Sequence, residues 1–90
     1  MAIDAAFKCP FSKSETRARL LKYIHIENEE FNELVLSYAG KWAWAFYETT
    51  YDEKGMPEAV LYVKFSRRFS EDERLLLVEE ISQLGFVLFE

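Results

Sequence analysis

The sequence predicts one α+β domain in which an antiparallel sheet of three or four strands carries helices on one face. Two segments, residues 12–15 and 70–73, have a serine three residues before a glutamate, which is the spacing of a helix capping box. Residues 41–51 and 58–67 are rich in aromatic and β-branched residues, and the first alternates with the period of two that is typical of strands. Aromatic residues form 17% of the 90 residues, so a full core is available and intrinsic disorder is excluded.

Helices are expected after both capping boxes. The first helix frays near residue 26, and Asn28 begins a second helical segment that Gly40 ends. This second segment is predicted because its apolar residues follow the spacing of an amphipathic helix: Phe31, Leu34, Val35 and Tyr38. The last helix runs from the second box to about Leu84, and Gly85 ends it.

Strands are expected on both sides of these helices. Residues 41–51 and 58–67 form a hairpin around a turn at 52–57, in which Gly55 allows a positive φ. Residues 3–9 and 86–89 are predicted as short strands. If the two early helical segments are merged, the order is βαββαβ, which is the order of a ferredoxin-like sandwich. Without residues 3–9 the sheet has three strands.

The register of the hairpin determines which face of the sheet stays open. If Tyr51 pairs with Glu58, the numbers of paired residues sum to 109. The bulkier face then packs against the helices, with the pairs Trp44–Phe65 and Phe46–Val63. The other face, which helices on one side leave toward solvent, carries Ala45, Tyr47, Tyr62 and Lys64. A slip of one residue exchanges the two sides.

The final strand is apolar on both sides, which is typical of a strand that is covered on both sides. Since helices cover one face of this small sheet, we expect an N-terminal arm, a second copy of the chain or a partner protein over the other. The predicted partner-binding residues are Tyr47, Tyr62, Lys64, Val87 and Phe89.

No catalytic, metal-binding or nucleotide-binding motif is present, so we expect a non-enzymatic protein without a cofactor. Cys9 and His25 are the only residues of their kinds, and a zinc site needs about four ligands. Cys9 is expected as a small buried residue and His25 as an ordinary helix residue. The acidic runs 27–33 and 71–73 stand at predicted helix starts, where the helix dipole favours negative charge.

Charge and composition point to three functions. The net charge is −5, although residues 1–26 carry five basic and two acidic groups. No apolar run is long enough for a membrane span, and a lone cysteine favours a reducing compartment, so we expect a soluble cytoplasmic protein. The leading hypothesis is protein–protein contact through the sheet, with a homodimer as the assembly. The second is single-stranded RNA or DNA binding on the open face, helped by the basic residues of 13–22. The third is an acidic inhibitor that presents residues 27–33. The aromatic stripe of Trp42, Trp44 and Phe46 is assigned to the core.

Overall fold

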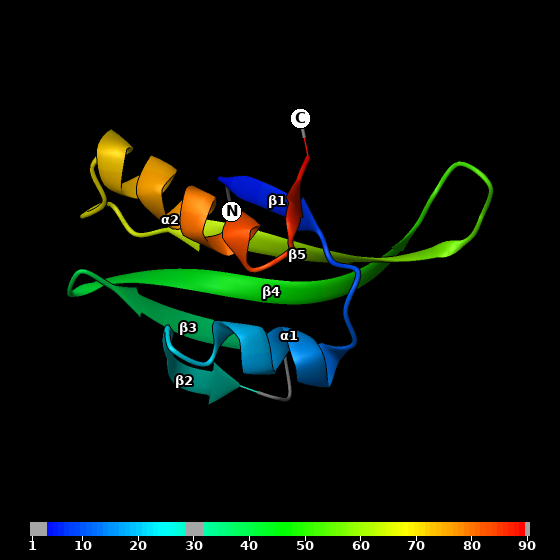
Figure 1. Ribbon diagram of the computed structural model, residues 1–90, viewed down its shortest axis with the longest axis horizontal. Helices are drawn as coiled ribbons and strands as arrows, with labels where there is room; N and C mark the ends of the chain where they lie inside the picture. Colours follow the sequence, from blue (N-terminus) through cyan, green and yellow to red (C-terminus); the bar gives the residue numbers. More distant parts are fainter. Residues whose placement is uncertain (1–3, 29–31, 90) are drawn as a thin grey trace.

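The structure, a computed structural model, describes residues 4–28 and 32–89, which form one six-stranded antiparallel sheet and two helices (Figure 1). The predicted α+β class is confirmed, whereas the predicted size of three or four strands is wrong. The helices are α1 (Lys13–Leu20) and α2 (Glu71–Gln83). The strands are β1 (Ala5–Lys8), β2 (Ile24–Asn28), β3 (Glu33–Tyr38), β4 (Lys41–Tyr51), β5 (Pro57–Phe65) and β6 (Val87–Leu88).

The strands lie in the order β2-β3-β4-β5-β1-β6, and all neighbouring strands are antiparallel. Both helices lie on the same side of this sheet, α1 near β2 and β3, and α2 near β5 and β1 (Figure 1). The long hairpin of β4 and β5 extends beyond the rest of the molecule. The chain does not follow the predicted βαββαβ order, because the hairpin of β2 and β3 stands between α1 and β4.

The predicted helix over residues 28–39 is wrong, because Asn28 is the last residue of β2 and residues 33–38 form β3. Its turn into β4 consists of Ala39 and Gly40, whose φ angles are +51° and +76°. Tyr38 pairs with Lys41 across them. Two consecutive residues with positive φ are the signature of the two-residue turns that close tight hairpins. Gly40 therefore closes a hairpin and does not end a helix.

The helical period and the strand period both fit part of this segment, which explains why a helix was predicted. Leu34 and Tyr38 are four residues apart, a distance that suits one helix face and also one strand face, because four is a multiple of two. In the structure Leu34, Leu36 and Tyr38 reach the helix side in steps of two, and Leu36 is completely buried. Val35 points to the other side. Phe31 lies outside the described residues.

The predicted hairpin of β4 and β5 is present, but its register is shifted by one residue. Tyr51 pairs with Pro57, and the paired numbers sum to 108 instead of 109. As a result, Ala43 and Ala45 face the helices and are completely buried. The β5 residues predicted for the core do lie there: Leu61, Val63 and Phe65. The β4 residues predicted for the core, Trp44 and Phe46, lie on the opposite face.

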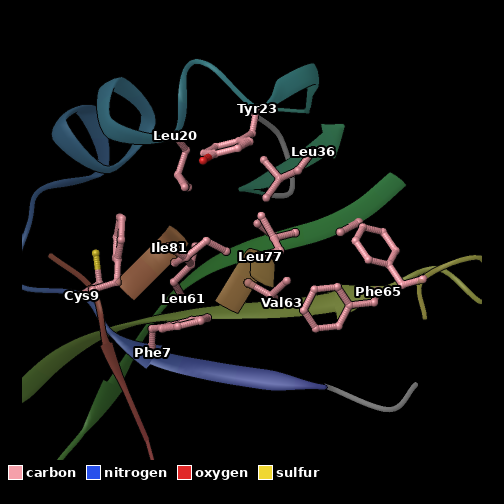
Figure 2. Packing of buried hydrophobic residues seen from close by; sticks show 14 residues of the cluster. Phe7, Cys9, Leu20, Tyr23, Leu36, Leu61, Val63, Phe65, Leu77 and Ile81 are labelled. Carbon is pink, nitrogen blue, oxygen red and sulfur yellow. The ribbon is translucent and has the colours of Figure 1, made fainter. Parts of the chain in front are cut away.

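The hydrophobic core lies between the sheet and the two helices (Figure 2). α1 contributes Leu20, and α2 contributes Leu77 and Ile81, all completely buried. Burying one such side chain stabilises the fold by about 1.5–3 kcal/mol. A hydrogen bond ties the turn between α1 and β2 to α2 at the edge of this core, where the Tyr23 hydroxyl donates to a Glu80 carboxylate oxygen at 2.6 Å. Burial and this bond raise the pKa of Tyr23 to about 12.

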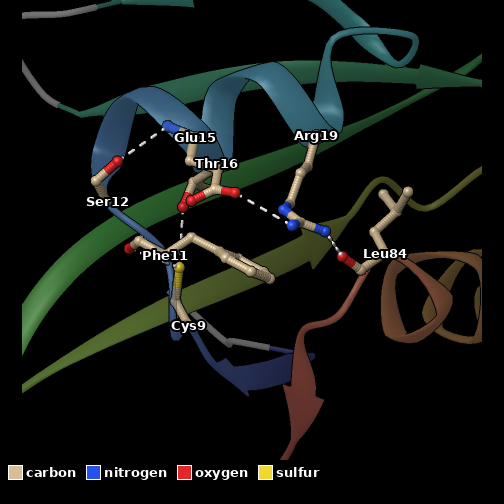
Figure 3. Close-up of polar contacts among 7 residues, drawn as sticks. All are labelled: Cys9, Phe11, Ser12, Glu15, Thr16, Arg19 and Leu84. Atoms are coloured by element: carbon tan, nitrogen blue, oxygen red, sulfur yellow. Dashed lines mark hydrogen bonds and ion pairs between the residues drawn. The ribbon is translucent and has the colours of Figure 1, made fainter.

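Both predicted N-caps are confirmed. Ser12 Oγ accepts from the Glu15 backbone N–H at 3.2 Å, and a complete capping box joins Ser70 to Glu73. Figure 3 shows how α1 then contacts the end of α2, because Arg19 donates to the Leu84 carbonyl at 2.7 Å. The first helix ends at Leu20, short of the predicted residue 26, since β2 begins at residue 24.

Gly85 is required where the chain leaves α2. Its φ is +104°, and a Cβ there would lie 2.7 Å from Phe11 Cζ. The Phe11 ring cannot move freely, because it is packed on two sides. It meets the Phe86 ring edge-on, with 5.2 Å between the ring centres, and the Arg19 guanidinium carbon lies 3.8 Å from the centre of the Phe11 ring. Glycine thus lets β6 return beside β1.

A pair of substitutions tests the observed register. Ala45→Leu adds volume beneath the helices, and we expect it to lower the free energy of unfolding by about 1–3 kcal/mol. Trp42→Leu changes a side chain that is 48% exposed, and we expect a loss of less than about 1 kcal/mol. Urea unfolding followed by circular dichroism measures both. The reverse ranking would mean that the tryptophans face the helices.

Candidate functional site

The candidate site is the sheet face opposite the helices, here named the open face. Paired residues of neighbouring strands point to the same side of a sheet, and successive residues of one strand to opposite sides. Because Ala43 and Ala45 lie on the helix side, the residues beside them face away. The central strands therefore place these residues on the open face: Val35 from β3; Trp42, Trp44, Phe46 and Glu48 from β4; and Val60, Tyr62 and Lys64 from β5.

Trp44 lies near the middle of the open face. It stands directly between Val35 on β3 and Lys64 on β5, and these neighbours leave it half-buried. Trp42 is 48% exposed, and the centre of its ring system lies 5.3 Å from that of His25. Alternate residues of a strand are about 7 Å apart, so the two indoles form one continuous apolar ridge. The two tryptophans give the face a large contact area. Each has only two side-chain torsion angles, so little conformational entropy is lost when they are immobilised by a partner.

Four of the five predicted partner-binding residues share this face. Tyr62 and Lys64 are half-buried beside the aromatic residues of β4. Val87 and Phe89 extend the face at its β6 edge, with exposed fractions of 56% and 38%. The Lys8 ammonium lies 5.6 Å from the centre of the Phe89 ring. No described element covers this edge, so the N-terminal segment from residue 4 onward is not the cover; β1 pairs beside β6.

Tyr47 does not share the open face, where the sequence had placed it. Its side chain lies on the helix side, and its hydroxyl donates to the Phe11 carbonyl at 3.2 Å. Burial raises its pKa. The one-residue shift that moves Tyr47 inward also moves the aromatic stripe outward. The sequence does contain a signal for this outcome, because small Ala43 and Ala45 alternate with the stripe and only small residues let helices approach a sheet closely.

A shallow hollow of about 400 Å³ lies at one end of the ridge. Its lining consists of Gly40, Lys41, Trp42, Trp44, Ser66 and Arg68. Lys41 donates to a Glu73 carboxylate oxygen, so its charge is already compensated. Arg68 is exposed, and in the described part of the chain it has no ion-pair partner. The hollow therefore combines two indoles with one uncompensated positive charge.

A second hollow of about 260 Å³ lies on the helix side, between α1 and the hairpin of β2 and β3. Three of its four charged lining residues have hydrogen-bond partners. Arg17 donates to Glu27 at 2.7 Å, and Lys13 donates to the Asn32 side chain. The bond from Arg17 lowers the pKa of Glu27. These contacts use much of the basic charge of residues 13–22 within the fold.

The residues weighed for chemistry are not brought together. Cys9 is buried, as predicted, and its sulfur lies 2.9 Å from the Thr16 hydroxyl. His25 is not a helix residue but an exposed residue of β2 that contacts Trp42 on the open face. A Cys9–His25 pair is therefore not formed. Across residues 4–28 and 32–89, no group of three histidine, cysteine or acidic side chains is placed to hold a metal ion.

One glutamate of each acidic run has a structural partner. Glu27 binds Arg17, while residues 29 and 30 of the first run lie outside the described residues. In the second run, Glu73 completes the capping box of α2 and also accepts from Lys41. The bond from Lys41, helped by Ser70, lowers the pKa of Glu73 to about 2.

The low pKa of Glu73 makes a stability contribution that depends on pH. The ionised carboxylate is favoured in the folded protein, so its contribution is complete above the ordinary pKa of 4.5 and is lost as the pH falls toward 2. Glu73→Gln keeps a residue suited to the capping box but removes this charge. We expect the stability difference between wild type and variant to shrink between pH 4.5 and pH 2. Urea unfolding across this range measures it, and a constant difference would contradict the assignment.

Within the described residues, no helix is long and apolar enough to cross a membrane. Comparison with protein-family models, with curated proteins and with solved structures finds no match to this chain. The arrangement of its own residues therefore carries the functional interpretation.

Proposed function

We propose that this chain is a small, non-enzymatic, cytoplasmic protein-interaction module whose contact surface is the open face. One observation carries the proposal: Trp42, Trp44, Phe46 and Tyr62 are adjacent on a sheet face that no described helix covers. Contiguous exposed apolar surface on a small protein marks an interaction site. A second copy of the chain is the first candidate partner.

The composition of the open face supports a protein partner. Tryptophan and tyrosine are enriched among the residues that dominate binding energy, and they cluster near the centre of an interface within a more polar rim. Trp44 occupies such a central position. Charged side chains stand around the aromatic residues, with Lys64 on one side, Glu48 farther along β4 and Lys8 toward β6.

We also infer that four strands form a ferredoxin-like unit to which β2 and β3 add a hairpin. Leaving out that hairpin, the chain order is β1, α1, β4, β5, α2, β6, and the spatial order is β4-β5-β1-β6. The added hairpin supports the proposal because Val35 and His25 widen the open face beside the two tryptophans.

Binding of single-stranded nucleic acid is the second candidate function. Its support is that the tryptophan stripe, Tyr62 and Lys64 lie on one face, where bases can stack beside a positive charge. Against it, charges of α1 that were expected to help are paired, Arg17 with Glu27 and Arg19 with Glu15. Titrating a labelled oligothymidylate at low salt decides between the two classes, and we expect no binding.

The protein-binding proposal is tested by capture from the native cell. We expect Trp44→Lys to reduce the captured partner, including an untagged copy of this chain, by roughly tenfold or more, since buried tryptophan contacts dominate interfaces. Trp42→Lys changes a more exposed residue of the same ridge. This variant is expected to stay folded, so a loss of capture by it reports on binding. Tyr51→Lys is the matched control, because Tyr51 is 72% exposed and stands at the end of the hairpin. Equal capture by all four proteins would refute the proposal.

A further inference from the structure

We infer that the occupant of the open face is a second copy of this chain, packed face to face about a two-fold axis that lies between the sheets and runs across the strands. This inference rests on the protein-binding function proposed above, and it adds the partner and its orientation. It is based on how charge is distributed along β4 and on the hollow at one end of the tryptophan ridge.

The two ends of the open face carry opposite charges. Arg68 follows β5 and lines the hollow beside Trp42 and Trp44. Glu48 lies at the other end of the stripe, one position beyond Phe46 on the same face. Both charged side chains are exposed, and neither has an ion-pair partner among residues 4–28 and 32–89. One end of the face therefore offers a free cation and the other a free anion.

The remaining charges of the central strands agree with this polarity. Lys64 pairs with Trp44, toward the Arg68 end, and Glu58 lies beyond Glu48 toward the hairpin turn. Glu58 has part of its charge balanced, because its carboxylate lies 3.8 Å from the Lys8 ammonium. Along β4 and β5 the face thus changes from basic to acidic, whereas on β1 the cation Lys8 stands in the same row as Glu48.

This polarity selects one symmetric arrangement. A two-fold axis that runs across the strands reverses the strand direction, so the Arg68 end of each copy meets the Glu48 end of the other, and the contact forms twice. An axis parallel to the strands would bring Arg68 against Arg68 and Glu48 against Glu48. Like charges placed together across an interface are costly, so the first arrangement is favoured.

The same arrangement accounts for the hollow and the aromatic ridge. With β4 lying antiparallel over β4, Trp44 of one copy meets Phe46 of the other, and Glu48 enters the hollow that Arg68 and Trp42 line. The Ser66 hydroxyl in that lining is buried and has no hydrogen-bond partner in the described structure. The six strands contain 37 residues, and at about 4.8 Å between strands and about 3.4 Å per residue they give a face of roughly 600 Å². This matches the lower end of the area that each partner of a specific interface buries, about 600–1,000 Å².

Reversing the two charges tests the inference. Sedimentation equilibrium of the full chain is expected to show a mass that rises with concentration from 10.7 kDa toward twice that value. Arg68→Glu alone and Glu48→Arg alone each bring like charges together, and each is expected to weaken the dimer roughly tenfold or more. The double variant restores opposite charges at both contacts, so its dimer is expected to return to nearly wild-type strength.

Two controls carry the same changes of charge elsewhere. Arg67→Glu alters the exposed neighbour of Arg68 that does not line the hollow, and Glu79→Arg alters an exposed residue of α2 on the helix side. Both are expected to dimerise like wild type. Because all four positions are exposed, circular dichroism should show unchanged folding in every variant.

Three results would overturn the inference. A wild-type chain that stays monomeric at high micromolar concentration excludes the second copy; the proposed function then still stands if Trp44→Lys abolishes capture of another protein. A wild-type dimer that neither single reversal weakens excludes the proposed orientation. A double variant that stays as weak as the single variants excludes it as well.

Discussion

The alternation of alanine with large aromatic residues along β4 is the constraint on which the rest of the structure depends. Ala43 and Ala45 are completely buried in the same cluster as Leu20 of α1 and Leu77 of α2. Their small side chains leave room for both helices on one side of the central strands. Successive side chains of a strand point to opposite faces, so the inward position of the two alanines places Trp42, Trp44 and Phe46 on the open face. Figure 2 shows the packing on the helix side.

That constraint separates the residues that hold the fold from those available for contact. The core, the helix N-caps and the hydrogen bond between Tyr23 and Glu80 all lie on the helix side or at its margin. The indoles of the open face are not part of the buried cluster. A binding surface of this kind can change in sequence without removing the interactions that stabilise the domain. It also exposes apolar area that a second protein surface can cover.

The sequence predicted the elements whose signals are local and missed those that depend on register. The capping boxes at Ser12 and Ser70 predicted both helix starts, because a cap is formed by neighbouring residues. The register depended on the turn after Tyr51, where the Asp52 carboxylate accepts from the backbone N–H groups of Lys54 and Met56, each at 2.9 Å. This compact turn pairs Tyr51 with Pro57, whereas the sequence prediction had assumed that Tyr51 pairs with Glu58.

The candidate site was therefore predicted in part. Tyr62, Lys64, Val87 and Phe89 were placed on the correct face because β5 and the final strand were oriented correctly. The aromatic stripe was missed because bulk was equated with burial, although the volume beneath the helices is limited. The hairpin of β2 and β3 was missed because its apolar residues satisfy the helical and the strand periods together.

The most direct test of this account is the register of β4 and β5 in solution, measured by nuclear Overhauser contacts between backbone protons of the two strands. The account predicts contacts between residues whose numbers sum to 108, such as Trp44 with Lys64 and Phe46 with Tyr62. These contacts place the tryptophans on the open face. Contacts between residues whose numbers sum to 109, such as Trp44 with Phe65, would turn the stripe toward the helices and contradict both the site and its proposed function.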